Sequence, residues 1–383
     1  MTPAARVQAA IECLDRIASG AAAEQVLTDW GRRSRYAGSK DRAAVRDHVF
    51  DALRQWRSSA VLGGSESGRG RMIGLLRASG IDPETLFTGE RFAPEPLSDA
   101  ERAAGAAPEG AAAWDLPDWL ARRFTDDLGD EAETAAQALR HRAPVTLRVN
   151  RLKTTLEAAR ADLSAEGIET EPNPRAPLAL TVTSNPRRVA QSAAYQDGRV
   201  ELQDASSQAI VAALPLKPGA RVLDYCAGGG GKALAMAAET GGRIDCHDAA
   251  PRRMADLPAR AARAGADLRI VPAPEGTYDL VLCDAPCSGS GTWRRAPEAK
   301  WRLSPGDLDD LLTVQAEILD RAATLVGPGG ALAYATCSIL SAENSSQIKS
   351  FLDRNPKWER GDELRFLPDH AGDGFYLCVL FCR

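Results

Sequence analysis

The chain has 383 residues, a formal net charge of −5, and 44% hydrophobic and 26% charged residues. This length suggests two or three domains with a sizeable core. No apolar run approaches the ~18 residues that span a bilayer, and the N-terminus lacks an apolar signal core, so we expect a cytoplasmic protein with reduced cysteines. The eight cysteines form no Cys-x-x-Cys pair and the four histidines are scattered, which disfavours a metal site.

The first part of the chain is predicted to be helical. Apolar residues repeat at helical spacing up to Gly20, and a second helical run begins at Ser39. Residues 1–60 carry ten Lys and Arg against seven Asp and Glu, a local positive excess. We therefore predict a separate helical domain over residues 1–75. Residues 76–113, rich in alanine, proline and glycine towards their end, are predicted to be a linker.

The pattern changes after the predicted linker. Residues 114–195 are predicted to form an α+β region, with a helix from Leu116 to about residue 144, a strand over Pro144–Asn150 and a helix over Thr155–Gly167. From residue 196 to residue 383, short apolar runs alternate with helical patterns. This alternation predicts an α/β domain with a parallel sheet.

A glycine-rich turn lies between a predicted strand, Arg221–Tyr225, and a predicted helix. Glycines let main-chain N–H groups approach a ligand, and a helix N-terminus favours negative charge. About twenty residues further on, the next predicted strand ends in a carboxylate that suits the hydroxyls of a ribose. The residues predicted from this pattern to bind a nucleotide-type cofactor are Cys226, Ala227, Gly228, Gly229, Gly230, Gly231, Lys232 and Asp248.

Other interpretations of this turn are possible from the sequence. A P-loop would need glycine at Cys226 and serine or threonine at Ala233, so it is disfavoured. The spacing of Gly228, Gly230 and Ala233 does match the permissive dinucleotide fingerprint, which keeps a nicotinamide-dependent dehydrogenase open. A third interpretation is a tight turn without a ligand.

Two cysteines follow strand-like apolar runs. Cys287 lies in the segment Asp284–Gly291, and Cys337 lies between Thr336 and Ser338. The carboxyl ends of parallel strands line the ligand crevice of an open α/β sheet, so both thiols are expected to reach one site. Two thiols beside a cofactor turn suggest covalent catalysis on an electrophilic carbon.

Three motifs, in this order, carry a resemblance to a known family. They are Leu223-Asp-x-Cys-Ala-x-x-Gly-Gly-Lys232, Asp284-Ala-Pro-Cys-Ser-Gly-x-Gly291 and Thr336-Cys-Ser338. The chain resembles the S-adenosylmethionine-dependent RNA cytosine-5 methyltransferases, in particular their bacterial ribosomal-RNA (RsmB/Sun-type) branch. The resemblance covers residues 115–383. It extends more weakly to the N-terminus, which is similar to the NusB-like helical RNA-binding domain that these enzymes often carry.

The resemblance implies an α/β fold. A Rossmann-like class I methyltransferase domain with a mostly parallel seven-stranded sheet is expected over residues 196–383, preceded by an α+β extension over residues 114–195 and by the helical domain. The resemblance also implies that the cofactor is S-adenosyl-L-methionine. The implied partner is RNA, and within the family branch it is small-subunit ribosomal RNA. The protein is expected to act as a monomer without a membrane partner.

The family chemistry implies roles for four side chains. Cys337 is expected to add to carbon 6 of cytosine, and Cys287 to assist release of the methylated base. DNA cytosine methyltransferases attack with a Pro-Cys thiol instead, so Cys287 is also an alternative nucleophile. Asp284 is expected to hydrogen-bond the base edge near the methionine end of the cofactor. Lys232 is expected to support the same region and to lower the pKa of a thiol.

The chain departs from the family pattern at two places. Gly229 stands where members usually have proline, and the predicted strand Leu268–Ala273 ends without the usual acidic residue. The adenine end of the cofactor would then be bound by main-chain groups or by Asp267. Basic residues around Arg294 and Lys300 are expected to contact RNA phosphate. Two other functions stay open from the sequence, a non-catalytic RNA-binding assembly protein and a nicotinamide-dependent dehydrogenase.

Overall fold

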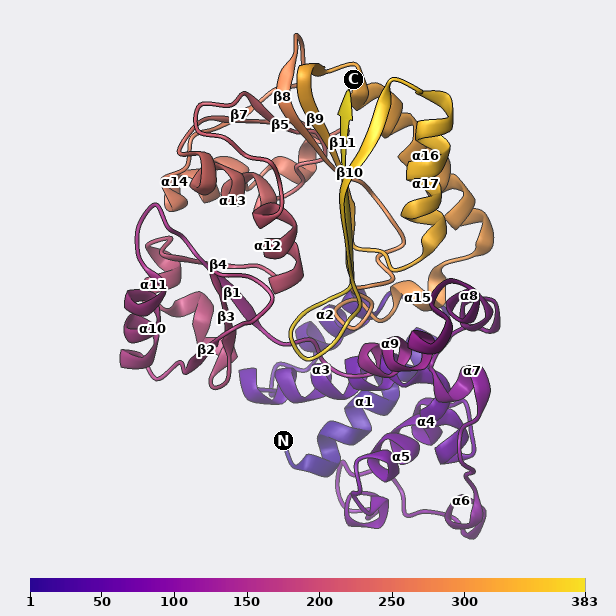
Figure 1. The fold of residues 1–383 in the computed structure, drawn as a ribbon. Coiled ribbons are helices and arrows are strands. Elements are labelled where there is room, and N and C mark those ends of the chain that lie inside the picture. The colour runs from indigo at the N-terminus through magenta and orange to yellow at the C-terminus, as the bar shows by residue number, and fades with distance from the viewer. Residues whose placement is uncertain (383) are drawn as a thin grey trace. The chain divides into compact units, whose positions relative to one another are not determined.

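The computed structural model describes residues 1–382, which divide into two compact units. The helical unit comprises Met1–Arg142 together with Trp293–Arg302, and the sheet unit comprises the rest of the chain from Ala143. Both sheets of the protein belong to the sheet unit (Figure 1). No described helix is long and apolar enough to cross a membrane.

The helical unit is built from helices whose apolar faces form one core, contributed largely by α1, α2, α3 and α5. Its compact part continues to Arg142, so the predicted domain boundary at residue 75 falls within α5, and the predicted linker contains the short helices α6 and α7. The helices of this unit are α1 (Pro3–Ala18), α2 (Ala23–Arg33), α3 (Ser39–Arg54), α4 (Trp56–Gly63), α5 (Gly68–Ala78), η1 (Pro83–Thr85), α6 (Asp99–Ala103), α7 (Gly110–Ala113), α8 (Asp118–Leu128), η2 (Gly129–Glu131), α9 (Ala132–Leu139) and α15 (Ala299–Arg302).

A segment from the second half of the chain, Trp293–Arg302, is part of the helical unit. The Trp293 ring stacks on Phe124 at a centroid distance of 6.1 Å and an interplanar angle of 9°. The indole Nε1 of Trp301 donates a hydrogen bond of 2.8 Å to the carbonyl oxygen of Leu53. Stacked aromatic rings and a satisfied indole N–H anchor this segment in the helical core.

Two basic residues of the same segment are interior residues. Arg294 and Lys300 are 3% and 1% exposed. Lys300 Nζ donates to the carbonyl oxygen of Arg54 at 3.0 Å, and Arg54 Nε donates to the carbonyl oxygen of Arg294 at 2.7 Å. The expectation that Arg294 and Lys300 contact RNA phosphate is therefore wrong, because both residues are buried inside the helical unit.

Burial lowers the pKa of Lys300 to about 7. The unfolded chain, with a lysine pKa of ~10.4, binds the proton that the folded chain lacks between these two values, so stability rises with pH across this window. We predict that Lys300→Met, compared with wild type, gains stability as the pH falls from 9 towards 7. Thermal melts at stepped pH measure the difference, with the exposed Lys40→Met as control. A difference that does not vary with pH would contradict a neutral Lys300.

The sheet unit begins with a small antiparallel sheet of order β2-β3-β1-β4. Its apolar face packs against α10 and α11. The predicted strand over Pro144–Asn150 and the predicted helix over Thr155–Gly167 are confirmed as β1 and α10. The elements are β1 (Thr146–Val149), α10 (Leu156–Ala165), β2 (Thr170–Pro172), β3 (Ala179–Val182), η3 (Pro186–Gln191), α11 (Ala193–Gln196) and β4 (Val200–Leu202).

The large sheet has seven strands in the order β10-β11-β9-β8-β5-β6-β7. β11 pairs antiparallel with β10 and β9, and the other pairings of the sheet are parallel, so the predicted mostly parallel seven-stranded sheet is confirmed. The strands are β5 (Val222–Asp224), β6 (Ile244–Cys246), β7 (Leu268–Ile270), β8 (Tyr278–Asp284), β9 (Val326–Thr336), β10 (Trp358–Phe366) and β11 (Phe375–Cys382).

Helices cover both faces of this sheet, which makes a three-layer arrangement (Figure 1). One apolar layer lies between the sheet and α12 and α13, and the other lies between the sheet and α16 and α17. The remaining elements are α12 (Ala205–Ala212), α13 (Gly231–Thr240), η4 (Pro251–Met254), α14 (Leu257–Ala264), α16 (Pro305–Ala323), η5 (Ser341–Glu343) and α17 (Ser345–Arg354).

The parallel strands decide which residues share one edge of the sheet. The carboxyl ends of β5, β6, β8 and β9 lead to Asp224, Asp248, Asp284 and Cys337. Asp267 instead precedes β7, at the amino edge, and pairs with Arg243 at 3.1 Å. The expectation that Asp267 binds the adenine end of the cofactor is therefore wrong, because the ligand crevice of such a sheet lies at the carboxyl edge.

Candidate active site

The two predicted thiols lie next to each other at the carboxyl edge. β8 and β9 are parallel neighbours, with Asp284 paired to Ala335. The loops that follow place the Sγ of Cys287 3.4 Å from the Sγ of Cys337. Neither cysteine is in a disulfide. The structure thus brings together, in one site, two thiols that are fifty residues apart in the chain.

The two thiols differ in acidity. The hydrogen bond from the Cys287 thiol lowers the pKa of Cys337, and the Lys232 ammonium and the Thr292 hydroxyl, 3.8 Å from the Cys337 sulfur, lower it further, against the opposing effect of burial. The same sulfur–sulfur hydrogen bond, together with burial, raises the pKa of Cys287 well above its usual value. Cys337 is therefore the thiol that ionises first.

A buried ion pair lies beside the thiols. Lys232 Nζ donates to Asp284 Oδ2 at 2.7 Å and lies 5.1 Å from the centre of the Phe375 ring. Burial lowers the pKa of Lys232, but the attraction of Asp284 outweighs burial and raises it. The ammonium therefore stays charged. The Asp284 side chain is 33% exposed, so its carboxylate is accessible to a ligand.

Both thiol loops are held by one buried carboxylate that the sequence did not point out. Glu343 is fully buried, and its Oε1 accepts hydrogen bonds from the Ser288 main-chain N–H at 2.8 Å and from Gln315 Nε2 at 3.0 Å. Its Oε2 accepts from the hydroxyls of Ser288, at 2.6 Å, and Ser338. Ser288 follows Cys287 and Ser338 follows Cys337. Glu343 therefore fixes the separation of the two thiols.

We predict that Glu343→Gln slows, at least tenfold, the covalent adduct formation at Cys337 that the family resemblance implies. The amide presents an N–H group where the carboxylate accepted, and each lost charge-assisted hydrogen bond costs about 1.5–3 kcal/mol. Single-turnover kinetics with trapped adduct measure the rate. Cofactor affinity should be unchanged, because Glu343 does not contact the glycine turn. Glu363→Gln, which removes the carboxylate that accepts from the Tyr376 hydroxyl at 2.6 Å, controls for general loss of stability. An unaltered adduct rate in Glu343→Gln would exclude the positioning role.

The glycine turn has the geometry predicted for a cofactor loop. Gly228 and Gly230 adopt positive φ angles of 49° and 79°, and Gly231 begins α13. A Cβ atom on Gly230 would lie 1.9 Å from Leu257 Cδ1, so a larger residue would strain the positive φ and displace the Leu257 side chain. The carbonyl of Gly229, at the position where the family usually has proline, accepts a hydrogen bond from Arg260. The turn presents main-chain N–H groups at a helix N-terminus.

Asp248 fixes this turn from the next strand. Its carboxylate is buried and accepts from the N–H groups of Gly228, at 3.0 Å, and Ala250, at 2.9 Å. Arg253 lies 3.2 Å from the same carboxylate. Each carboxylate oxygen has two lone pairs, so these contacts leave capacity for a ligand hydroxyl. The predicted ribose-binding residue is thus also the residue that shapes the turn.

Asp224, at the end of β5, is a site residue that we did not predict. Its Oδ1 atom is buried and has no hydrogen-bond partner among the described residues. Burial, followed by the repulsion of Asp284, raises the pKa of Asp224 to about 7. A buried carboxylate oxygen without a partner favours a cationic ligand group. Burial also raises the pKa of the neighbouring Cys226 thiol, which leaves it neutral.

Comparisons with known proteins show the family of the chain. The family model described as 16S rRNA methyltransferase RsmB/F matches residues 211–381, and a model of the RsmF/B-like ferredoxin-like domain matches residues 116–189. The ribosomal RNA small subunit methyltransferase B of Cronobacter sakazakii is 34% identical over 287 residues, which cover 70% of this chain and 67% of that protein. The chain belongs to the RsmB/F methyltransferase family.

Other relatives extend the comparison. The ribosomal RNA small subunit methyltransferase B of Salmonella arizonae is 35% identical over 250 residues, which cover 63% of this chain and 58% of that protein. The match therefore spans less than two thirds of this relative's length. The crystal structure of PH0851 superposes with a TM-score of 0.78 at 25% identity and covers 99% of both chains. The predicted Rossmann-like class I methyltransferase fold is confirmed.

The cofactor of this family is S-adenosyl-L-methionine, and the residues of the turn fit it. The unpartnered oxygen of Asp224 suits a positively charged group, and this cofactor carries both an ammonium and a sulfonium. The Asp248 carboxylate suits the ribose hydroxyls, and the N–H groups at Gly228–Gly231 suit the cofactor carboxylate. This assignment excludes the alternative interpretation of the turn as the binding site of a nicotinamide-dependent dehydrogenase.

We predict that affinity for S-adenosylhomocysteine rises between pH 6 and pH 8. Asp224, with a pKa of about 7, is protonated at the lower pH and cannot pair with the ligand ammonium until it ionises. Asp224→Asn should bind more weakly at pH 8 and lose most of the pH dependence. Calorimetry at stepped pH measures both quantities. Asp256→Asn, on the same unit outside the turn, is the control. A wild-type affinity that is constant across this range would contradict the proposed pairing.

Proposed function

We propose that the protein transfers a methyl group from S-adenosylmethionine to carbon 5 of a cytosine in small-subunit ribosomal RNA, through a covalent adduct with Cys337. The observation that carries the proposal is the pair of unequal thiols, 3.4 Å apart, beside the Lys232–Asp284 ion pair. Family membership supports the RNA substrate. The reaction would take place in the cytoplasm with the protein as a monomer.

The attack begins at Cys337. Its sulfur is the more acidic of the two thiols, and the thiolate adds to carbon 6 of the cytosine ring, which makes carbon 5 nucleophilic. Asp284, accessible and held by Lys232, is positioned to accept a hydrogen bond from the base edge. The cofactor, when bound, supplies the methyl group that carbon 5 takes up. The target base must leave its stack to reach the crevice.

Release depends on Cys287. The proton on carbon 5 must leave before the sulfur–carbon bond can break and restore Cys337. The pKa of Cys287 is raised first by its hydrogen bond to Cys337. That cause and the repulsion by the Cys337 thiolate disappear once the Cys337 sulfur is bonded to carbon, so the pKa of Cys287 falls within the adduct, although burial still raises it. A thiolate at Cys287 can then accept the carbon 5 proton.

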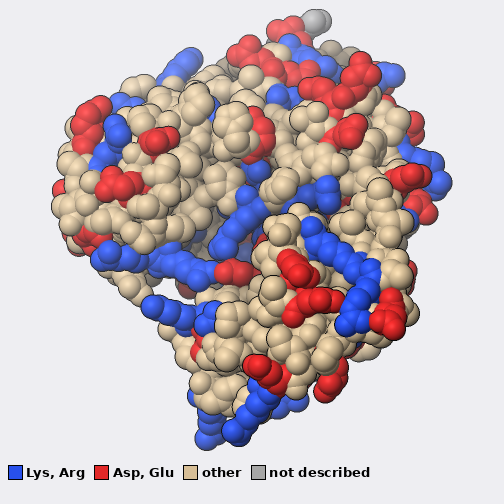
Figure 2. Space-filling model, turned by 90° about the horizontal axis from the view of Figure 1, so that it is seen from below, with Lys and Arg blue, Asp and Glu red and all other residues tan. Residues whose placement is uncertain are grey.

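Binding of RNA phosphate would require basic groups on the surface of the protein. Figure 2 shows Lys and Arg side chains gathered in several streaks on the drawn face, beside separate acidic clusters. The net charge of −5 does not itself attract RNA, so local basic groups have to do so. Binding through such groups weakens as salt rises.

The two thiol variants are predicted to fail differently. Cys337→Ala should form neither adduct nor product, because the nucleophile is missing. Cys287→Ala should accumulate a covalent protein–RNA adduct, because methyl transfer precedes the step that it blocks. Its adduct formation should also require higher pH, because the hydrogen bond that lowers the pKa of Cys337 is lost. Denaturing gels with ribosomal RNA and methyl donor, run over a pH series, measure both effects.

The controls separate the two assignments. Cys283→Ala removes a buried cysteine of β8 and should leave adduct chemistry unchanged. Adduct from Cys337→Ala and none from Cys287→Ala would place the attack on the Pro-Cys thiol instead. Product formation by Cys337→Ala without any adduct would exclude covalent catalysis. Bisulfite mapping of ribosomal RNA from a deletion strain identifies the cytosine.

A further inference from the structure

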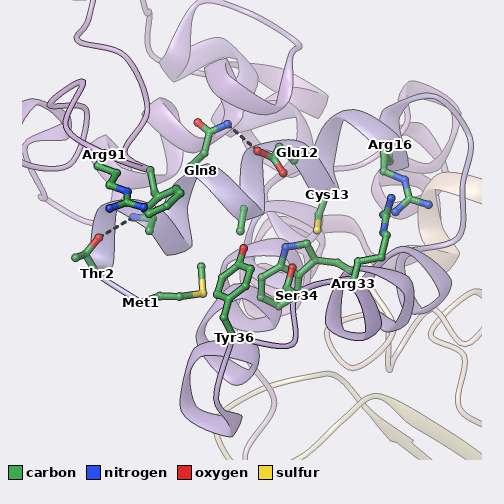
Figure 3. A pocket seen from close by; sticks show the side chains of 14 residues that line it. Met1, Thr2, Gln8, Glu12, Cys13, Arg16, Arg33, Ser34, Tyr36 and Arg91 are labelled. Atoms are coloured by element: carbon green, nitrogen blue, oxygen red, sulfur yellow. Dashed lines mark hydrogen bonds between the residues drawn. The ribbon is translucent and has the colours of Figure 1, made fainter.

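A cavity of about 830 Å³ lies wholly within the helical unit (Figure 3). Its floor is one face of α1, including Ala5, Ala9 and Cys13. Its walls are the end of α2 with the loop that follows, and the loop at Arg91 and Phe92. The volume falls within the range of about 300–1,000 Å³ that is typical of ligand pockets. The proposed methyl transfer makes no use of this cavity.

Exposed aromatic rings gather at the cavity. Tyr36 and Phe92 are 74% and 68% exposed, the highest values among the large apolar residues that the structure describes. Both line the cavity, together with the buried Trp30. Apolar rings left in water at one concave site mark a binding surface, because covering them with a ligand is favourable.

The loop that carries Phe92 is held in an unusual conformation. Phe92 has a φ angle of 67°, which a bulky residue rarely adopts. Two main-chain hydrogen bonds close the loop, from Gly89 N to Pro94 O at 2.9 Å and from Ala93 N to Glu90 O at 2.8 Å. Such strain persists where the surrounding structure fixes it, and it is common at ligand clamps. The loop thereby presents an aromatic ring at the cavity in a fixed position.

Cationic groups lie at the two ends of the cavity. Figure 3 shows Arg16 and Arg33 at one end and Arg91 at the other. Among the described residues, Arg33 and Arg91 form no salt bridge, and Arg16 has one ion-pair contact, of 3.6 Å, with Asp29. Arg33 Nε donates a hydrogen bond of 3.3 Å to the Asp29 carbonyl oxygen, and the Arg91 guanidinium lies 4.8 Å from the centre of the Phe92 ring, so one face of that ring is left for a base. The Nη1 atom of Arg16 is buried without a hydrogen-bond partner in the described part of the chain. These guanidinium groups are therefore available to an anionic ligand.

We propose that this cavity binds an unstacked base of single-stranded RNA between Tyr36 and Phe92, with neighbouring phosphates on the arginines at its ends. The inference rests on the proposed RNA substrate. It adds a second RNA contact site, formed by residues that are distant in the sequence from Cys287 and Cys337. Bases of single-stranded RNA stack on aromatic rings, and guanidinium groups match phosphate oxygens. An apolar protein segment would cover the rings but leave the guanidinium groups unpaired, which is unfavourable.

The acidic residue in the lining is compatible with this ligand. Glu12 accepts a hydrogen bond from Gln8 Nε2 at 3.0 Å, which holds its carboxylate on the α1 face. A carboxylate in that position can accept from the exocyclic amino group of a base. Three arginines against one glutamate still leave the lining positive.

Replacing both rings tests the stacking. The double variant Tyr36→Ala/Phe92→Ala should bind a fluorescein-labelled single-stranded RNA 16-mer about tenfold or more weakly than wild type. Affinity for the same sequence as a duplex should change much less, because duplex bases are not free to stack on protein rings. Ile81→Ala, which removes an exposed apolar side chain of the helical unit outside the cavity, is the matched control. Anisotropy titrations measure the affinities, and melting curves verify folding.

Removing the charges tests the phosphate contacts. Arg33→Gln/Arg91→Gln should reduce the slope of log K against log salt by about 1.4, because each single-strand phosphate contact contributes about 0.7. Arg102→Gln, an exposed arginine of the same unit that pairs with Glu84 and Asp99, should leave the slope unchanged. Crosslinking of 4-thiouridine RNA to peptides containing Tyr36 or Phe92 would localise the base directly.

The outcomes separate this inference from the proposed function. Wild-type protein that methylates ribosomal RNA, with unchanged RNA affinity in both double variants, would overturn the cavity site and leave the methyltransferase proposal intact. Wild-type protein that neither methylates nor binds RNA would defeat the proposed function itself. Reduced affinity in the double variants together with intact S-adenosylhomocysteine binding would establish an RNA site separate from the cofactor site.

Discussion

The parallel pairing of β8 with β5 on one side and β9 on the other is the constraint on which the site depends. It sends three chain segments out of the sheet at the same edge, so the cofactor turn after β5 meets the loops of Cys287 and Cys337. Parallel strands of this kind are buried on both faces, and here helices cover each face. The apolar core thereby holds an edge made of polar and reactive side chains.

At that edge, electrostatics assign different states to chemically similar groups. Asp284 is paired with Lys232, whereas Asp224, buried beside them with an unpartnered oxygen, has a pKa that burial raises to about 7. The thiols diverge in the same way, because one donates the hydrogen bond that the other accepts. Opposite shifts in neighbouring groups of the same type are a common mark of an active site. Glu343 holds the two thiol loops in the arrangement that produces the opposite pKa shifts of Cys287 and Cys337.

The path of the chain ties the catalytic loop to the helical unit. The loop of Cys287 continues through Thr292 directly into Trp293–Arg302, which is packed among the helices. Trp293 and the buried Lys300 have their partners there. Deleting the N-terminal region would therefore remove the packing partners of this segment.

The sequence by itself determined the order of motifs, the parallel sheet, the glycine turn and the two cysteines as a common site. These features follow from local patterns, because strand ends and helix starts are marked by neighbouring residues. Where local pattern and site coincide, as at Asp248 and Lys232, the prediction located residues that the structure places at the carboxyl edge.

Tertiary structure alone decided which side chains meet. Glu343 binds Ser288 of the Cys287 loop, 55 residues away in the sequence. The sequence suggested that Lys300 is a surface cation, but the structure buries it among helices from the N-terminal part of the chain. Asp267 precedes the strand β7, so its place at the amino edge already followed from the order of residues along the chain. Burial and long-range hydrogen bonds depend on the packing of distant elements, and no local spacing encodes them.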